Sequence, residues 1–134
     1  MTRPLRVALV SLFLAISSQQ TSASTAPGAY DASATSSAVC TLGYARRHRN
    51  VPYRIRDRVY NAYGLARGHR RGYVIDHLIP LELGGTNTIA NLWPQPRPES
   101  KRKDRDEGRL HDQVCNGEMT LASAREEMIR LWRR

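Results

Sequence analysis

The sequence predicts a small α+β domain, and three observations support this fold class. Apolar residues recur at helical spacing over residues 53–63. Two short stretches, 73–75 and 88–93, are rich in β-branched and aromatic residues, which is typical of strands. Helical patterns return over 99–114 and 121–131. The expected order is therefore a helix, two short strands and two helices.

The first helix is predicted from Ile55, Val59 and Tyr63, which lie on one face and are separated by charged residues. Pro52 stands near its first turn and Gly64 just past its end, as these residues do at helix boundaries.

The strand over 73–75 is separated from the second strand, Thr88–Trp93, by the glycine pair Gly84-Gly85. Proline lacks a backbone N–H, so the residues Pro94, Pro96 and Pro98 are expected to bar any regular element before the next helix.

The next helix is expected over Glu99–Val114, with Glu99 near its positive end and Asn116-Gly117 closing it. Thr120 is expected to cap a last helix. This helix would bury four apolar side chains, Leu121, Ala124, Met128 and Leu131.

The first 23 residues read as a signal peptide. Arg3 and Arg6 precede a short apolar run, and small residues follow it. The run is too short to span a bilayer, although a retained membrane anchor is the alternative. Residues 24–39 are mostly Ser, Thr and Ala and are expected to form a flexible leader. The folded domain is then expected over 40–134, in a secreted or periplasmic protein.

The chain is strongly basic. Its formal net charge is +9, and removal of residues 1–23, which contain two arginines and no acid, lowers it to +7. Polyanions are natural partners of such a surface, because bound phosphates release condensed counterions. A basic surface that only serves solubility is the alternative.

Cys40 and Cys115 are the two cysteines of the chain. Two cysteines in a small exported domain are expected to pair in an oxidising compartment. On the chain-entropy model, closing a loop of this length stabilises the domain by about 4 kcal/mol. No motif around either residue favours a nucleophilic thiol.

Asp76 and His77 carry the chemistry that the sequence suggests. Hydrolysis of a phosphodiester needs a base that deprotonates water and a cation that absorbs charge on the phosphate. Imidazole titrates near neutral pH and suits the first task, and a carboxylate suits a hard cation. A buried, hydrogen-bonded His77 and an Asp76 that caps a turn are the structural alternatives.

The motif Asp76-His-Leu-Ile-Pro-Leu-Glu-Leu-Gly-Gly followed by Asn91-Leu-Trp-Pro resembles the HNH, or ββα-metal (His-Me finger), endonuclease superfamily. The wider stretch from Cys40-Thr-Leu-Gly-Tyr to Val114-Cys115 is similar to small exported bacterial HNH-like proteins. The resemblance implies a ββα-metal core with flanking helices. It further implies His77 as general base, Asp76 as a metal ligand and Asn91 as the residue that holds the loop and orients the base.

The chain departs from the family pattern after Asn91, because no histidine stands at the start of the following helix. Glu99, Glu107 and His111 remain candidates for the missing ligand. Glu107 and His111, four residues apart on one helix face, are the favoured pair. Glu107 paired with Lys103 is the structural alternative.

Basic residues flank the motif on both sides. Four of them are predicted to contact nucleic-acid phosphates: Arg70, Arg71, Lys101 and Arg102. No base-reading motif is present, so low sequence specificity is expected.

The leading hypothesis is an exported metal-dependent nuclease that acts on nucleic acid, with DNA as the expected substrate. The expected cofactor is a divalent ion, Mg²⁺, with Zn²⁺, Mn²⁺ and Ni²⁺ as alternatives because of His111. A non-catalytic nucleic-acid or polyanion binder with the same fold is the second hypothesis, and an exported interaction module is the third. The sequence does not identify an immunity or inhibitor protein.

Overall fold

The structure, a computed structural model, describes residues 26–133. The signal peptide predicted over residues 1–23 lies outside the described residues. Among residues 26–133, no helix is long and apolar enough to cross a membrane.

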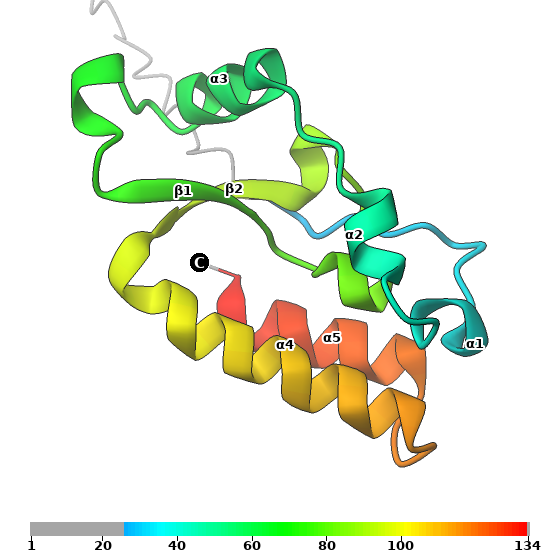
Figure 1. The fold of residues 1–134 in the computed structure, drawn as a ribbon. Coiled ribbons are helices and arrows are strands. Elements are labelled where there is room, and N and C mark those ends of the chain that lie inside the picture. Colours follow the sequence, from blue (N-terminus) through cyan, green and yellow to red (C-terminus); the bar gives the residue numbers. More distant parts are fainter. Residues whose placement is uncertain (1–25, 134) are drawn as a thin grey trace, which may run out of the picture.

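A two-stranded antiparallel sheet lies at the middle of the domain (Figure 1). It is formed by β1 (Tyr73–His77) and β2 (Leu92–Pro96), and the first residue of each strand lies opposite the last residue of the other. Helix α3 (Tyr53–Ala62) packs against both strands on one side. The hairpin formed by α4 (Ser100–Cys115) and α5 (Leu121–Trp132) lies on the other side (Figure 1).

Shorter elements complete the described chain. Two short helices, α1 (Ser36–Val39) and α2 (Tyr44–His48), precede α3. Four 3-10 turns connect the longer elements: η1 (Arg67–His69), η2 (Leu81–Leu83), η3 (Ile89–Asn91) and η4 (Arg97–Glu99). The mixed helix-and-strand class predicted from the sequence is confirmed.

The main core lies between the sheet, η2 and the α4–α5 hairpin. Its fully or almost fully buried members include Leu78, Ile79, Leu110, Met128 and Trp132. Burial of large apolar side chains is the main favourable contribution to folding. This core therefore holds α4 against the segment that follows β1.

The predicted helices are confirmed within one or two residues. α3 begins after Pro52 and buries Val59 completely, and Gly64 follows it with a φ of 69°. Thr120 caps α5, because its side-chain oxygen accepts a hydrogen bond from the backbone N–H of Ser123.

The second strand differs from the prediction. Residues 89–91 form η3, and β2 runs over Leu92–Pro96, so Pro94 and Pro96 lie inside a strand that they were expected to bar. The reason is that each strand of a two-stranded sheet has one unpaired edge. The N–H of Arg97 donates to the carbonyl of Gly72 next to β1, so the alternate positions 94 and 96 direct their nitrogens to the unpaired edge, where no N–H is needed.

Residues 26–39 were expected to belong to a flexible leader, and this expectation is wrong for the described part. Ala26 is buried in the core, and its N–H donates to the Tyr63 hydroxyl at 2.6 Å. Tyr30 forms a β-bridge with Gly85. The buried Arg125 stacks on the Tyr30 ring at 4.2 Å. A few backbone and aromatic contacts therefore order a segment whose composition alone is poor in apolar surface.

The predicted disulfide between Cys40 and Cys115 is confirmed. It joins the residue that follows α1 to the last residue of α4, with a Cα–Cα distance of 5.6 Å. The described residues contain no free cysteine. The bond links the N-terminal segment to the helix that follows the sheet.

Candidate active site

Asp76 and His77 are the last two residues of β1. Successive side chains of a strand point to opposite sides, so the two residues meet different surroundings. The Asp76 side chain is 24% exposed and faces α4, where it pairs with Lys103. His77 is only 3% exposed and faces Asn87 in the segment between the strands.

Lys103 lies at the centre of an ionic cluster. Its side chain is completely buried, and Nζ lies 2.8 Å from Oδ2 of Asp76. The same nitrogen donates to Oε1 of Glu107 and, at 2.7 Å, to the backbone carbonyl of His77. An ammonium group has three N–H donors, so all three are used. A single buried cation thus attaches α4 to the end of β1.

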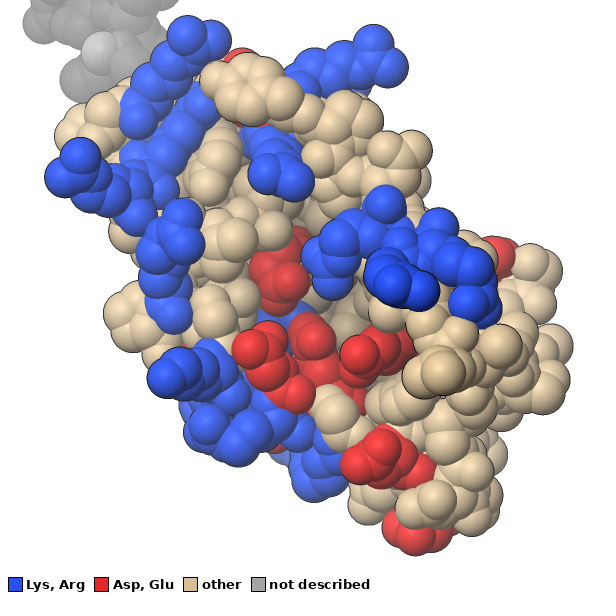
Figure 2. Space-filling model, in the orientation of Figure 1, with Lys and Arg blue, Asp and Glu red and all other residues tan. Residues whose placement is uncertain are grey.

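Glu107 is the most perturbed acid of the described chain. Burial raises its pKa to about 7, the nearby carboxylates of Asp76 and Glu82 add to this effect, and Lys103 opposes it. The cluster therefore holds three carboxyl groups near one ammonium group, and Glu107 changes its charge near neutral pH. Figure 2 shows Asp and Glu side chains gathered at the centre of one face, with Lys and Arg side chains around them.

A hydrogen-bond network orients the His77 ring. Its Nε2 lies 3.0 Å from Oδ1 of Asn87, and this oxygen also accepts from the N–H of Asn50. The other side of the amide, Nδ2 of Asn87, donates to the carbonyl of His48 at 2.7 Å. Because an amide oxygen only accepts, Nε2 of His77 carries the hydrogen. In the neutral ring, Nδ1 then keeps the lone pair.

The neutral form of His77 is favoured. Burial lowers its pKa below the usual value, and this outweighs the hydrogen bond to Asn87 and the charge of Asp76, which raise it. The hydrogen bond between the ring and Asn87 is made through Nε2 and not through Nδ1. The ring is therefore held in the form that can accept a proton at Nδ1.

Asn91 closes the segment that follows His77. It is completely buried; its Oδ1 accepts from the N–H of Ile79, and its Nδ2 donates to the carbonyls of Ile79 and Thr86. The backbone of Gly85 lies very close to that of Ile79, since a Cβ at position 85 would be 1.8 Å from the Ile79 carbonyl oxygen. The amide of Asn91 is thus fully used by the backbone, which makes it a positioning residue.

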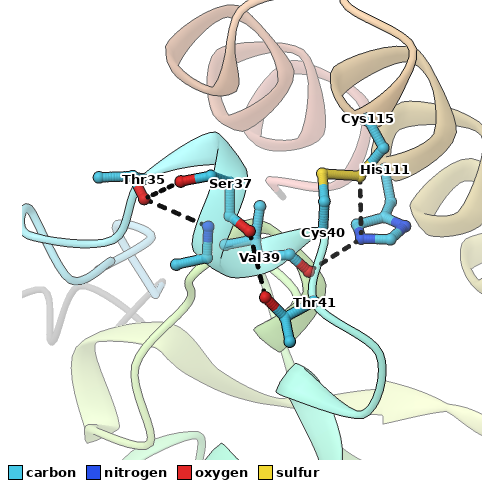
Figure 3. The surroundings of a disulfide bond; sticks show 8 residues. Thr35, Ser37, Val39, Cys40, Thr41, His111 and Cys115 are labelled. Atoms are coloured by element: carbon cyan, nitrogen blue, oxygen red, sulfur yellow. Dashed lines mark hydrogen bonds between the residues drawn. A yellow bond between two sulfur atoms is a disulfide. The ribbon is translucent and has the colours of Figure 1, made fainter.

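His111 lies elsewhere on α4, next to the disulfide (Figure 3). Its Nε2 donates to the carbonyl of Val39 at 3.2 Å and lies 3.5 Å from Sγ of Cys115. The ligand atoms of Cys40, His111 and Cys115 lie within 4.8 Å of one another, and they are the only group of three such residues in the described chain. Both sulfurs are in the disulfide, so neither is a thiolate. His111 is not brought together with Asp76.

The four predicted nucleic-acid contacts fall into two groups. Arg71, Lys101 and Arg102 are exposed, and Arg102 stacks on the ring of Trp132 at 4.4 Å. The Arg70 side chain is only 14% exposed and donates to Asp57 at 2.6 Å. Arg70 is thus largely committed to contacts within the domain.

Asp76 and Glu107 supply carboxylate oxygens, the ligand type that a hard divalent ion prefers, and both are paired with the Lys103 ammonium. Each carboxylate gives one oxygen to Lys103 and keeps the other. Glu82 adds negative charge beside them. Mg²⁺ is commonly bound through one or two carboxylates, with water and substrate phosphate completing its shell. The third candidate, Glu99, precedes α4 at its N-cap position and forms no side-chain cap there.

Two residues of the site were not predicted from the sequence. Lys103 was considered only as a partner of Glu107, four residues away on the same helix, and nothing in the pattern showed that it also reaches β1. Asn87 follows the glycine pair in an irregular segment, and its bond to His77 depends on how that segment folds back.

Comparison with known proteins adds no relative: no family model matches the chain, and no curated protein or solved structure does so.

Proposed function

We propose that this protein is an exported, metal-dependent nuclease that hydrolyses nucleic-acid phosphodiester bonds with low sequence specificity. One observation carries the proposal. At the end of β1, the buried, neutral His77 donates its Nε2 hydrogen to Asn87. The preceding residue in the strand, Asp76, belongs to the carboxylate cluster around Lys103. A proton acceptor and a set of oxygen ligands thus come from adjacent residues.

In this mechanism Nδ1 of His77 accepts a proton from the water that attacks the phosphate. A general base of this kind contributes roughly 10²–10⁴-fold to a rate. Asn87 keeps the other ring nitrogen protonated, and Asn91 holds the segment that follows His77. Lys103 fixes the backbone of His77 through the bond to its carbonyl.

Asp76 and Glu107 would hold the divalent ion, for which Mg²⁺ suits the all-oxygen set best. When bound, the ion absorbs negative charge on the phosphate and on the leaving oxygen. His111 is left out of the proposed set because its Nε2 is bonded to Val39 beside the disulfide.

The order of elements supports an HNH-like core. Strands β1 and β2 are followed directly by α4, and the Asp-His pair lies where β1 approaches that helix. The exposed Arg71, Lys101 and Arg102 are proposed to hold the phosphates of DNA around the acidic centre. The disulfide is consistent with a secreted or periplasmic location.

A second function, non-catalytic binding of nucleic acid or another polyanion, is favoured by one observation. The ammonium of Lys103 already stands between Asp76 and Glu107 and neutralises them. A protein of this kind would bind DNA in a salt-sensitive way and would not cleave it.

The test is cleavage of a supercoiled plasmid by the oxidised protein with Mg²⁺ or Mn²⁺. Under the nuclease proposal His77→Ala lowers the nicking rate by about 100-fold or more. The exposed His69 in η1 offers a matched control, and His69→Ala should nick like the wild type. Equal nicking by the two variants, or DNA binding without any metal-dependent cleavage, would reject the nuclease in favour of the binder.

A further inference from the structure

A pocket on the α3 side of the domain is not explained by the proposed active site. It has a volume of about 310 Å³ and lies between α3 and the 3-10 turn η1. Its lining combines two tyrosines, three arginines and one aspartate: Tyr53, Arg56, Asp57, Tyr60, Arg67 and Arg70. The four residues from α3 are spaced as neighbours on one helix face. We call this feature the Tyr–Arg pocket.

One wall of the Tyr–Arg pocket is held firmly by Arg70. Its guanidinium donates to Asp57 at 2.6 Å, to Asn61 at 2.7 Å and to the Leu65 carbonyl at 3.0 Å. It also lies over the Tyr60 ring, 4.7 Å from the centroid. The single acid of the pocket is thus bound to an arginine, and the wall is organised before any ligand arrives.

The other wall is open and positively charged. Tyr53 is 71% exposed. The Arg67 side chain is 79% exposed, and its Nε is 3.9 Å from Asp57. Arg56 uses only its Nε, which donates to the Val51 carbonyl. With three arginines and one aspartate, an uncompensated charge of +2 stands beside an exposed aromatic ring.

We propose that the Tyr–Arg pocket binds one nucleotide of single-stranded nucleic acid, with the base on Tyr53 and the phosphate between Arg56 and Arg67. Bases stack on aromatic side chains without regard to sequence, and arginines hold the backbone. The volume is at the lower end for ligand pockets and suits one nucleotide. A duplex keeps its base faces stacked inside, so it cannot use the Tyr53 ring.

The position of the pocket relates it to the active site. The Tyr60 hydroxyl donates to the carbonyl of Tyr73, the first residue of β1, at 3.4 Å. The Asp76–His77 pair ends the same strand, about 13 Å further along at the usual rise per residue. The pocket therefore gives the nuclease a preference for single-stranded substrate. This preference rests on the proposed function, whereas the binding itself does not.

Binding is tested by fluorescence anisotropy with a labelled oligothymidylate and a duplex of equal length. EDTA and the His77→Ala background keep the measurement independent of cleavage. Tyr53→Leu should raise the Kd for the oligothymidylate about 10-fold, because stacking is lost, and should change the duplex Kd less than about 2-fold. Tyr53→Phe keeps the ring and should bind like the parent. The exposure of Tyr53 makes these variants safe for folding, which circular dichroism checks.

Arginine variants test the phosphate contact. Arg67→Gln should weaken oligothymidylate binding and lower the salt slope by about 0.7. Arg58→Gln is the matched control, because Arg58 is exposed on α3 and does not line the pocket. The proposed binding site would be overturned if Arg58→Gln and Arg67→Gln weakened binding equally, or if Tyr53→Leu and Tyr53→Phe did so. Equal effects on duplex and single-strand binding would also overturn it, as would binding of polyglutamate as tight as that of oligothymidylate. Tyr53-dependent binding without plasmid nicking keeps the pocket and rejects only the nuclease.

Discussion

Glu107 and His111 are four residues apart on α4, yet they belong to different regions of the molecule. Glu107 is part of the ionic cluster with Lys103 and Asp76 at the end of β1. His111 contacts Sγ of Cys115 in the disulfide and donates a hydrogen bond to the carbonyl of Val39. The first region collects charge in a partly buried place, and the second is a covalent and hydrogen-bonded attachment of the N-terminal segment.

The difference shows how far one helical turn reaches. Four residues advance about 6 Å along a helix axis. Over this distance the neighbour of α4 changes from β1, beside Glu107, to the end of α1, beside His111. Two side chains on one helix face can therefore have unrelated roles. The separation of an ionic region from a disulfide region has four measurable consequences.

The largest effect is expected from Lys103→Met. This variant keeps the bulk of the side chain and leaves two carboxylates without their cation. Breaking a buried pair in this way costs about 3–5 kcal/mol of the free energy of unfolding, measured by urea denaturation. Lys101→Met, on an exposed position of the same helix, should stay within about 0.5 kcal/mol. Similar losses from both variants would show that the cluster does not hold α4 to β1.

The second effect concerns the disulfide region. Cys40→Ala combined with Cys115→Ala should lower the free energy of unfolding by about 2–4 kcal/mol, because the unfolded chain loses a constraint over 75 residues. The cleavage rate per folded molecule should stay within about 2-fold, since the disulfide does not contact the ionic cluster. A loss of cleavage that exceeds the unfolded fraction would mean that the two regions are coupled.

The third effect compares the two helical side chains directly in the plasmid assay. Glu107→Ala should lower metal-dependent nicking by about 100-fold, which corresponds to about 2.7 kcal/mol. His111→Ala should lower it less than about 3-fold when the protein is folded. A larger loss of nicking from His111→Ala than from Glu107→Ala would show that His111, and not Glu107, is the metal ligand on α4.

The smallest effect is a pH dependence of stability in EDTA. An unfolded Glu107 loses its proton near pH 4.5, whereas in the folded protein its pKa is about 7. Between these values the folded state binds more protons, so raising the pH weakens it. At about 1.4 kcal/mol per pKa unit, the full difference would correspond to about 3 kcal/mol. The Glu107 side chain is 18% exposed and partly screened by solvent, so relative to Glu107→Gln the wild type should lose about 1–2 kcal/mol between pH 4.5 and 7. The lowered pKa of His77 acts in the opposite direction, and the difference between the two proteins cancels it. If the difference in the free energy of unfolding between the two proteins did not change with pH, the burial of the Glu107 carboxyl group would be contradicted.

Elements with a local signal were predicted well from the sequence. The spacing of Ile55 and Val59 identified α3, and Thr120 identified the start of α5. The second strand was misplaced, because the prolines were judged without knowing that their nitrogens face an unpaired edge. The order in residues 26–39 was also missed, because it depends on contacts such as those between Ala26 and Tyr63 or Tyr30 and Arg125.

The chain alone predicted helices α3, α4 and α5, the Asp76–His77 pair at the end of a strand, the basic charge and the pairing of the two cysteines. Periodicity, capping and composition are local properties, and they can be read along the chain. The surroundings of each side chain were set by the tertiary structure. It placed Lys103 between two carboxylates, Asn87 on the His77 ring and His111 beside the disulfide. No local pattern shows these surroundings, because burial and charge partners, which set the chemistry of a side chain, come from residues distant in sequence.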